Sequence, residues 1–233
     1  MKWSMRESRM KILGMNASPK GAQSQTLRLV RAVLNGAADE GAETELVDIY
    51  RLKVGYCTAC GVCYAEGECT LIDDFPDLME KMLDAEGIVL GSPNYIDSVT
   101  APMKAIFDRM ADAVHRQLFS GKYGCAVCTA GGSGQEKVVD YMNHVIIALG
   151  GTAVGGVGVA VGRDPNAILE GERDARELGK RLVQSIRGEH RYPEQEVIHR
   201  QRREYFSQMV RYNRDRWPFE YEWWVRQGAI REI

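Results

Sequence analysis

"MKILGMNASPKGAQSQT", residues 10–26, is the stretch that decides the fold of this chain. Its first seven residues form an apolar run that is typical of a buried strand, and a polar turn rich in hydroxyl groups follows directly. The turn leads into residues 24–41, where apolar side chains recur at helical spacing and Ser24 is the expected N-cap. A buried strand, a short turn and an amphipathic helix are the beginning of a crossover between parallel strands.

The same alternation continues along the chain, which predicts an α/β fold. Apolar or β-branched runs predict four further strands, at residues 44–50, 87–93, 122–132 and 152–161. Amphipathic stretches predict four further helices, at residues 74–85, 101–118, 136–149 and 167–186. We therefore expect one three-layer, doubly wound domain over residues 10–187, built on a five-stranded parallel sheet.

Composition narrows the class of protein and of partner. The chain has 233 residues, of which 45% are hydrophobic and 27% charged, and a net charge of −2. These values are typical of a globular domain and offer no strong field for nucleic acid or for an anionic membrane. No apolar run approaches the length of a membrane span, and residues 1–10 hold no leader-like apolar stretch. We expect a cytoplasmic protein whose partner is a small molecule or another protein.

Residues 188–233 differ from the rest of the chain and form a C-terminal extension. They hold nine of the nineteen aromatic residues and nine arginines, with no lysine. One helical face is predicted to be apolar, consisting of Ile198, Tyr205, Phe206, Met209 and Val210. We expect the extension to pack on its own domain or on a partner subunit; the alternative is that it covers the active site or receives a partner protein.

Three loops follow strands and should meet at one edge of the sheet, where open α/β sheets bind ligands. The first, "NASPKGAQSQT", lacks G-x-G-x-x-G but offers hydroxyls, the Lys20 ammonium and the free N–H groups of a helix start. These groups suit the terminal phosphate of FMN better than a dinucleotide, although a plain capping turn would have a similar composition. The other two loops, "GSPNYIDSVTAPMK" and "TAGGSGQE", offer backbone donors, an aromatic edge and close approach to a flat ring. Together the loops predict a flavin pocket.

Four cysteines lie in "CTACGVCYAEGEC", residues 57–69, after the second predicted strand and thus at the same edge. Their spacing, C-x2-C-x2-C-x5-C, is ferredoxin-like, because three closely spaced thiolates can face one iron-sulfur cube and a fourth can return to it. Zinc, a redox disulfide and a loop without metal are the alternatives. Cys125 and Cys128 fall in a predicted buried strand and are expected to be core residues that point to opposite faces. His115 is expected to be a surface or capping residue. Lys104 and Arg109 are expected to form helical ion pairs with Asp108 or Asp112; the alternative is that they face the cofactor edge.

"KILGMNASPKGAQSQT", "AEGIVLGSPNY", "APMKAIFDR" and "TAGG" together resemble the NADPH-dependent FMN reductase group of flavodoxin-like proteins. The compact cysteines resemble its iron-sulfur flavoprotein branch. The resemblance covers residues 10–187 and implies a flavodoxin-like domain with FMN and a [4Fe-4S] cluster. The implied phosphate ligands are Ser18, Lys20, Ser24, Gln25 and Thr26; family members often have arginine where this chain has Lys20. The implied flavin contacts are Pro93, Asn94, Tyr95, Ile96, Ala130, Gly131, Gly132 and Ser133, and the implied cluster ligands are Cys57, Cys60, Cys63 and Cys69.

The first functional hypothesis is therefore an FMN-dependent oxidoreductase without a catalytic nucleophile or acid. It would carry electrons from a ferredoxin-like or other reduced donor, through the cluster and FMN, to oxygen, peroxide or a quinone-like acceptor. One alternative is a cluster-free NAD(P)H-dependent FMN or quinone reductase. Another is a non-catalytic redox carrier or partner protein. The resemblance also implies a homodimer or homotetramer.

Overall fold

The computed structural model describes residues 10–162, 164 and 166–231, and its centre is a five-stranded parallel sheet. The expectation about a leader concerns residues 1–10, nearly all of which lie outside the described part. The strands run in the order β2-β1-β3-β4-β5 and are all paired in parallel. Their bounds are β1 Lys11–Asn16, β2 Glu43–Asp48, β3 Gly87–Pro93, β4 Tyr123–Ala130 and β5 Thr152–Ala160.

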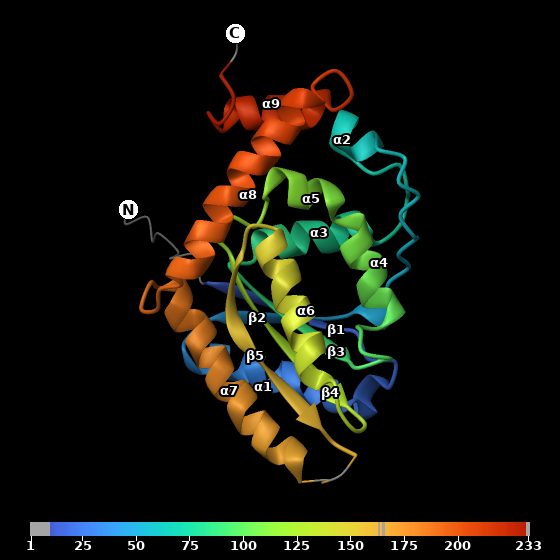
Figure 1. The fold of residues 1–233 in the computed structure, drawn as a ribbon. Helices are drawn as coiled ribbons and strands as arrows, with labels where there is room; N and C mark the ends of the chain where they lie inside the picture. The colour runs from blue at the N-terminus through green and yellow to red at the C-terminus, as the bar shows by residue number, and fades with distance from the viewer. Residues whose placement is uncertain (1–9, 163, 165, 232–233) are drawn as a thin grey trace, which may run out of the picture.

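Helices cover both faces of the sheet, which makes three layers (Figure 1). One face is covered by α1 Gln25–Asp39 and α7 Ala167–Ile186. The other is covered by α3 Phe75–Asp84, α4 Ala101–Arg109, α5 Ala111–Arg116 and α6 Gln135–Ala148. The strand order reverses between β1 and β3, so the doubly wound α/β prediction is confirmed and a ligand crevice is expected beyond the carboxyl ends of these strands.

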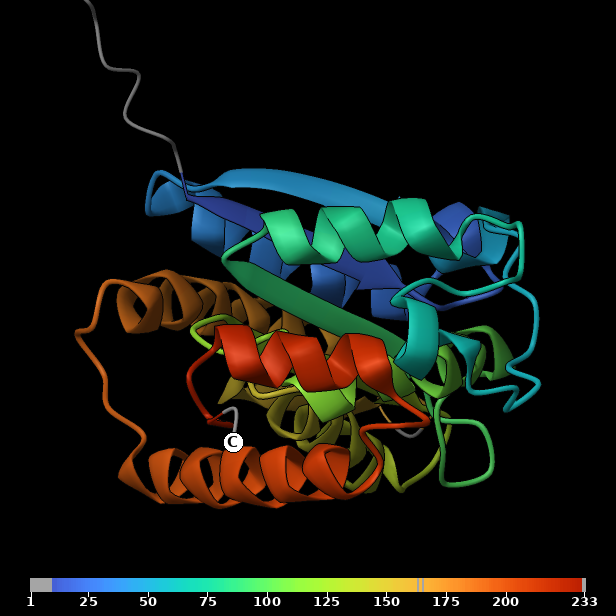
Figure 2. The ribbon, with the colours of Figure 1, turned by 90° about the horizontal axis from the view of Figure 1, so that it is seen from above.

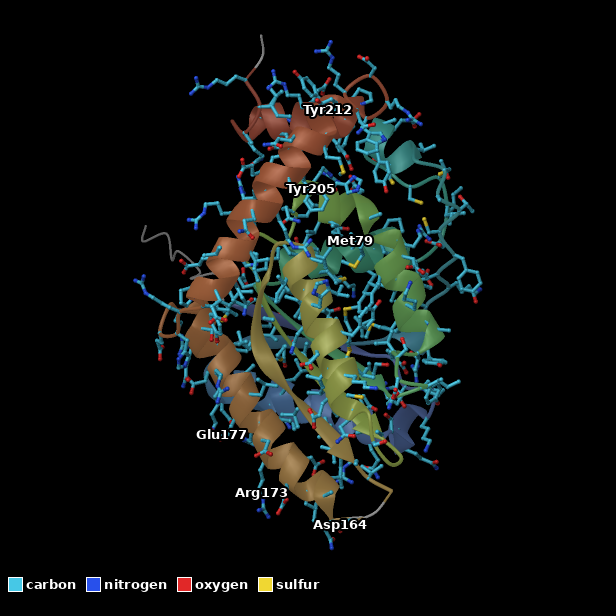
Figure 3. The ribbon with its side chains drawn as sticks, viewed as in Figure 1. Met79, Asp164, Arg173, Glu177, Tyr205 and Tyr212 are labelled. Carbon is cyan, nitrogen blue, oxygen red and sulfur yellow. The ribbon has the colours of Figure 1, made fainter. Side chains whose placement is uncertain are left out.

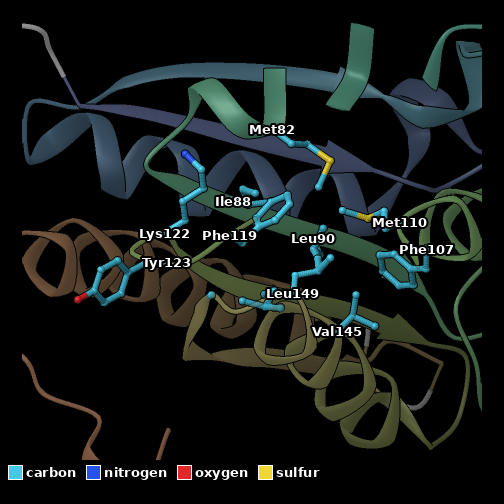
Figure 4. A pocket seen from close by; sticks show the side chains of 12 residues that line it. Met82, Ile88, Leu90, Phe107, Met110, Phe119, Lys122, Tyr123, Val145 and Leu149 are labelled. Atoms are coloured by element: carbon cyan, nitrogen blue, oxygen red, sulfur yellow. The ribbon is translucent and has the colours of Figure 1, made fainter. Parts of the chain in front are cut away.

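Two buried layers of apolar side chains hold the sheet to its helices. Cys125 packs in the layer under α1 and α7, and Cys128 in the opposite layer, and each is fully buried. Their prediction as core residues on opposite faces is confirmed. Figure 4 shows a cavity in the second layer, lined by Met82, Leu90 and Leu149 among others. Its volume is about 10 Å³, so it is a packing gap too small for a ligand.

One helix expected over residues 101–118 is in fact broken at Met110. The N–H of Met110 bonds to the carbonyl of Phe107 at 3.1 Å, which tightens the last turn of α4, and a separate α5 follows. The expected ion pair between Arg109 and an aspartate on its own helix is wrong, because the guanidinium turns inward to Asp73, which lies before α3. The helical ion pair expected for Lys104 is confirmed, with Asp108 as its partner.

The C-terminal extension forms two helices, α8 Pro193–Tyr212 and α9 Pro218–Arg226, which lie against the domain of their own chain (Figure 2). The start of α8 binds the sheet, since the Gln195 side chain pairs with both backbone groups of Ala153 at 2.9 and 2.8 Å. Of the predicted apolar face, Phe206 and Val210 are buried, whereas Tyr205 is 61% exposed. None of the helices in the described ranges is long and apolar enough to cross a membrane.

Candidate functional site

A pocket of about 150 Å³ opens at the carboxyl ends of β1, β3 and β4, where the three polar loops meet. Nine of the thirteen predicted FMN contacts line it: Ser18, Lys20, Gln25, Thr26, Pro93, Asn94, Tyr95, Ala130 and Gly131. Ser24, Ile96, Gly132 and Ser133 do not line it. Two further lining residues were not predicted as contacts: Thr129, the last residue but one of β4, and Val161, which directly follows β5.

The first loop is held in place by the start of α1. The Ser24 hydroxyl accepts a hydrogen bond from the Leu27 N–H at 3.0 Å, so Ser24 is the N-cap that the sequence predicts. The hydroxyls of Thr26 and Thr129 bond to each other at 2.6 Å, which ties the start of α1 to the end of β4. Because Ser18 is also buried, the loop presents fixed hydroxyls rather than mobile ones.

The Gln25 side chain is also fixed, through two charged residues. Arg28 donates to the Gln25 Oε1 at 2.9 Å and makes a two-point pair with Glu172 of α7 at 2.7 and 2.8 Å. The Gln25 amide nitrogen is then the end left to face a ligand. An anion at this end would also meet the positive end of the α1 dipole.

The second and third loops are joined to each other. Asn94 donates from its side chain to the Ser133 carbonyl at 2.8 Å, and its backbone N–H bonds to the Thr129 carbonyl at 2.8 Å. The turn that follows is tight, with paired backbone bonds of 2.9 and 3.2 Å between Tyr95 and Ser98. These hydrogen bonds fix the conformation of the loop at Asn94, which forms one wall of the pocket.

The tip of this turn carries backbone strain. Ile96 and Asp97 have φ angles of 53° and 56°, in the left-handed region that a β-branched residue such as isoleucine rarely adopts. The Ile96 side chain is fully exposed, so packing of that side chain does not explain the conformation. Strain of about 1–3 kcal/mol that persists in a loop is typical of binding and catalytic sites.

Unpartnered polar atoms beside the pocket fit a polar ligand. Asn16, the last residue of β1, is only 1% exposed, and neither polar atom of its side chain has a hydrogen-bond partner in the described structure. The Asn94 Oδ1 is buried without a partner in the same way. Orphaned groups of this kind are rare in native proteins, so they indicate something that the protein binds. Asn16 was not among the predicted ligand contacts, although it is the first residue of the first loop, "NASPKGAQSQT".

The cysteine segment, residues 57–69, lies beyond β2 and carries four free thiols. Cys57 and Cys60 are exposed, whereas Cys63 and Cys69 are half-buried. Cys63 lies on a short helix, α2 Val62–Glu66, and the glycines at both of its ends adopt left-handed φ angles of 75° and 84°. These two turns fold the segment back toward the domain.

The thiols are not gathered in this structure. Nowhere in residues 10–162, 164 and 166–231 do three cysteine, histidine, aspartate or glutamate side chains lie close enough to hold a metal. The four-cysteine site therefore exists as a set of donors but not as a formed geometry. The physical reason is that metal binding commonly supplies the energy that brings such ligands together, and exposed thiols have little mutual attraction of their own.

The four thiols differ in their electrostatics. The backbone N–H of Val62, helped by the Thr58 hydroxyl, lowers the pKa of Cys60. Burial, with the nearby Asp112 carboxylate, raises the pKa of Cys63 to about 11. Of these two thiols, Cys60 is therefore the one that loses its proton more readily. We expect it to bind a metal or to react before Cys63 does.

A second, larger pocket of about 620 Å³ lies between the cysteine segment and the helices α3 to α5. Cys63 and Cys69 line it together with Arg109. The Arg109 side chain is 1% exposed and donates to Asp73 at 2.6 Å and to the Gly55 carbonyl at 3.1 Å. Burial opposes both charges, but their hydrogen bonds lower the pKa of Asp73 and, with the Cys69 thiol nearby, raise the pKa of Arg109. This pair fixes both ends of the cysteine segment to α4.

One histidine expected at the surface is instead part of the cysteine region. The His115 ring stacks on Tyr64 of α2 at 4.6 Å and bonds to the buried carboxylate of Glu220 in α9 at 3.1 Å. Sequence spacing could not find this contact, because the partners come from segments about fifty and one hundred residues away along the chain.

Sequence comparisons show the family to which this chain belongs. Residues 10–166 match the family described as NADPH-dependent FMN reductase. An "Iron-sulfur flavoprotein" of Archaeoglobus fulgidus is 32% identical over 226 residues, which cover 95% of this chain and 100% of that protein. An iron-sulfur flavoprotein of Methanocaldococcus jannaschii is 33% identical over 191 residues, which cover 76% of this chain and 98% of that protein.

Solved structures match the fold at low sequence identity. An NAD(P)H:quinone oxidoreductase from Methanothermobacter marburgensis has a TM-score of 0.60 at 17% identity and covers 75% of this chain and 100% of its own. A flavodoxin from the domain Archaea has a TM-score of 0.52 at 18% identity, covering 76% of this chain and 99% of its own. These likenesses support the flavodoxin-like arrangement of sheet and helices.

Proposed function

This chain belongs to the NADPH-dependent FMN reductase family, in its iron-sulfur flavoprotein branch, and on that premise we propose that it passes electrons from a ferredoxin-like donor through a [4Fe-4S] cluster and FMN to a small acceptor. The chain is an FMN-dependent oxidoreductase. The donor, the acceptor and the cluster are the proposed part. Oxygen, peroxide or a quinone-like compound is the acceptor class that we propose.

The meeting of nine predicted residues in one pocket is the observation that carries the FMN assignment. We assign the FMN phosphate to the first loop, through Ser18, Lys20, Ser24, Gln25 and Thr26. The flavin ring would lie against the other two loops, through Pro93, Asn94, Tyr95, Ile96, Ala130, Gly131, Gly132 and Ser133. The buried, unpartnered oxygen of Asn94 and the strained turn at Ile96 support this side, because both features are typical of loops that bind a ligand.

Bound FMN supplies a centre that exchanges either one or two electrons. The chain's own contribution is to hold the phosphate at the α1 N-terminus and to direct backbone donors at the ring. Neither role needs a nucleophile or a strong acid, and the absence of a catalytic side chain stays a prediction.

The cluster assignment rests on the chemistry of the donor set. Cys57, Cys60, Cys63 and Cys69 are free thiols, and the Val62 N–H lowers the pKa of Cys60. Thiolates are the ligands that iron-sulfur clusters require, and the bound cluster would supply single-electron exchange. The segment lies beyond the carboxyl end of β2, at the sheet edge that also carries the flavin pocket.

A cluster-free NAD(P)H-dependent FMN or quinone reductase is the second candidate. That activity would need only the pocket at the ends of β1, β3 and β4, and none of the four thiols. A non-catalytic redox carrier is the third. We keep the cytoplasmic location and the homodimer or homotetramer as predictions; size-exclusion chromatography with light scattering measures the latter.

Anaerobic purification followed by counts of iron, sulfide and flavin tests the proposal. We expect one FMN with about four iron and four sulfide per chain. Reduction of the flavin by a reduced ferredoxin, and slow or absent reduction by NADPH, would support the first candidate. Flavin without iron under strict anaerobic handling would contradict it, and fast turnover with NADPH would favour the second.

A further inference from the structure

We propose that the C-terminal extension is a clamp that holds the cysteine segment in the position from which it binds its cluster. In this assignment, which rests on the proposed function, Trp217, Phe219 and Glu220 are positioning residues. They press α2 against α5 from the side opposite the flavin domain's sheet. Figures 1 and 2 both show α9 lying beside α2, although the two helices are about 150 residues apart in the sequence.

The closest contact is between Phe219 and the backbone at Gly67. A Cβ atom added at Gly67 would lie 2.4 to 2.6 Å from three atoms of the Phe219 ring. The ring therefore lies directly on the chain at the end of α2. Gly67 stands between Cys63 and Cys69, so Phe219 supports the turn that connects two of the four thiols.

A second contact joins the middle of α2 to both α5 and the extension. The Tyr64 ring stacks on His115 of α5 at 4.6 Å and meets the edge of Trp217 at 5.2 Å. Phe206 of α8 closes the far side of His115, at 5.4 Å between ring centres. Tyr64 is the residue next to Cys63, so this aromatic stack fixes the helical turn that carries Cys63.

The buried Glu220 carboxyl group fixes the orientation of His115. Glu220 is 0% exposed, and its Oε2 bonds to the His115 Nδ1 at 3.1 Å. Burial of a carboxylate is unfavourable unless the group is paired, so this contact is a specific one. It locks the ring on which Tyr64 stacks.

Residues of α9 also contact Arg116, the last residue of α5. The Arg116 guanidinium lies 5.0 Å from the centre of the Phe219 ring and 5.2 Å from that of Trp223. The Trp223 indole N–H donates to the Arg116 carbonyl at 3.1 Å, and Asp112 pairs with the guanidinium. Phe219 thus bridges α5 and the cysteine segment.

These contacts supply order that α2 lacks by itself. A helix of five residues is far shorter than the length at which an isolated helix is stable. The one cysteine on this helix, Cys63, is half-buried, and its neighbour Tyr64 contacts His115 of α5 and Trp217 at the start of α9. We expect the turn that carries Cys63 and leads to Cys69 to become mobile when α9 detaches, while the flavin pocket, which the extension does not line, stays intact.

Phe219→Ala in the full-length protein tests the clamp, with Phe219→Leu as the conservative variant. Tyr212→Ala is the matched control, because Tyr212 is an aromatic residue of α8 that is 93% exposed (Figure 3). The first measurement is the rate at which iodoacetamide alkylates Cys63 in iron-free protein, read by peptide mass spectrometry. The second is iron and FMN per chain after anaerobic reconstitution, with the midpoint potential of any cluster that remains.

In Phe219→Ala, iodoacetamide should alkylate Cys63 about tenfold faster than in the wild type, because the cysteine segment opens locally more often. It should lose most of its iron and keep its FMN, and any remaining cluster should show a shifted midpoint potential. Phe219→Leu should restore most of the iron, and Tyr212→Ala should match the wild type.

Unchanged alkylation and iron in Phe219→Ala would overturn the clamp, and so would a loss of FMN equal to the loss of iron. A wild type that takes up FMN but no iron would contradict the proposed function instead. The alkylation rates of the iron-free proteins would then still decide whether α9 holds the segment.

Discussion

The flavin pocket and the cysteine segment lie at the same edge of one sheet, but they are held in different ways. The pocket is framed by strand ends and by a capped helix, and hydrogen bonds such as Thr26 to Thr129 join its loops directly. The cysteine segment has few backbone bonds to the sheet and depends on side chains, chiefly Arg109 at its base and Phe219 at its tip. The pocket therefore has its shape before any ligand arrives, whereas the thiols take their final places only with one.

Cys60→Ala is the change that separates the two regions most completely. Iron should fall from about four atoms per chain to nearly none, because one missing thiolate leaves the cube without a corner ligand. FMN content should stay the same. Inductively coupled plasma spectrometry and flavin absorbance measure both, and simultaneous loss of iron and FMN would show that the two sites are not independent.

Arg109→Met attacks the base of the cysteine segment. It leaves the Asp73 carboxylate and the Gly55 carbonyl without their cation, and we expect the free energy of unfolding to fall by about 3–5 kcal/mol. Urea unfolding at neutral pH measures the change. Lys104→Met is the matched control, because its pair with Asp108 is exposed on α4 and should be worth less than about 0.5 kcal/mol. An equal loss of unfolding free energy in the two variants would contradict the role of Arg109 in holding the cysteine segment.

Thr26→Val attacks the pocket alone. The valine keeps the volume but loses the hydroxyl that bonds to Thr129 and that we assign to the phosphate. The dissociation constant of FMN should rise about tenfold to a hundredfold, which is the range for a hydrogen bond to a charged group. Fluorescence titration of the apoprotein measures it, with Thr44→Val on the exposed edge strand as the control. Loss of iron in Thr26→Val would contradict the separation of the sites.

The smallest expected effect concerns His199, which joins the C-terminal extension to the domain and should make stability depend on pH. The imidazole donates to the Gly151 carbonyl at 2.9 Å, and burial lowers the pKa of His199. The unfolded chain therefore binds a proton at His199 more readily than the folded chain does. The stabilisation by the neutral, buried His199 is complete above about pH 6.5. It declines as the pH falls through the lowered pKa of the folded state. The decline should be about 1 kcal/mol or less, measured by urea unfolding at several pH values. His199→Gln should flatten that part of the curve, and an unchanged slope would assign it to other groups.

Local features were predictable and contacts between distant segments were not. Residues 10–26 predicted β1, the polar turn and the Ser24 cap, because each depends on neighbours within a few positions. Apolar periodicity predicted that Cys125 and Cys128 would point into opposite layers. The spacing of the cysteines also predicted a set of four thiol ligands. It did not predict whether the four thiols lie close together, because that depends on a bound ligand.

Residues with distant partners escaped the sequence analysis. Thr129 joins the pocket through a bond to a residue 103 positions earlier. Arg109 was expected to pair within its helix, yet it reaches 36 positions back to Asp73, where two charges can share one buried site. His115 was expected at the surface because its cover, Glu220, lies 105 positions later.

The burial of Cys125 and Cys128 gives this protein an internal reference for oxidative damage. Their burial raises the pKa of both thiols, so oxidants and alkylating reagents reach them only when the sheet opens. The other four thiols are at least partly accessible in the folded protein. In an iron-free sample, the ratio of modified to intact thiols therefore distinguishes a molecule that has lost only its redox segment from one that has lost its fold.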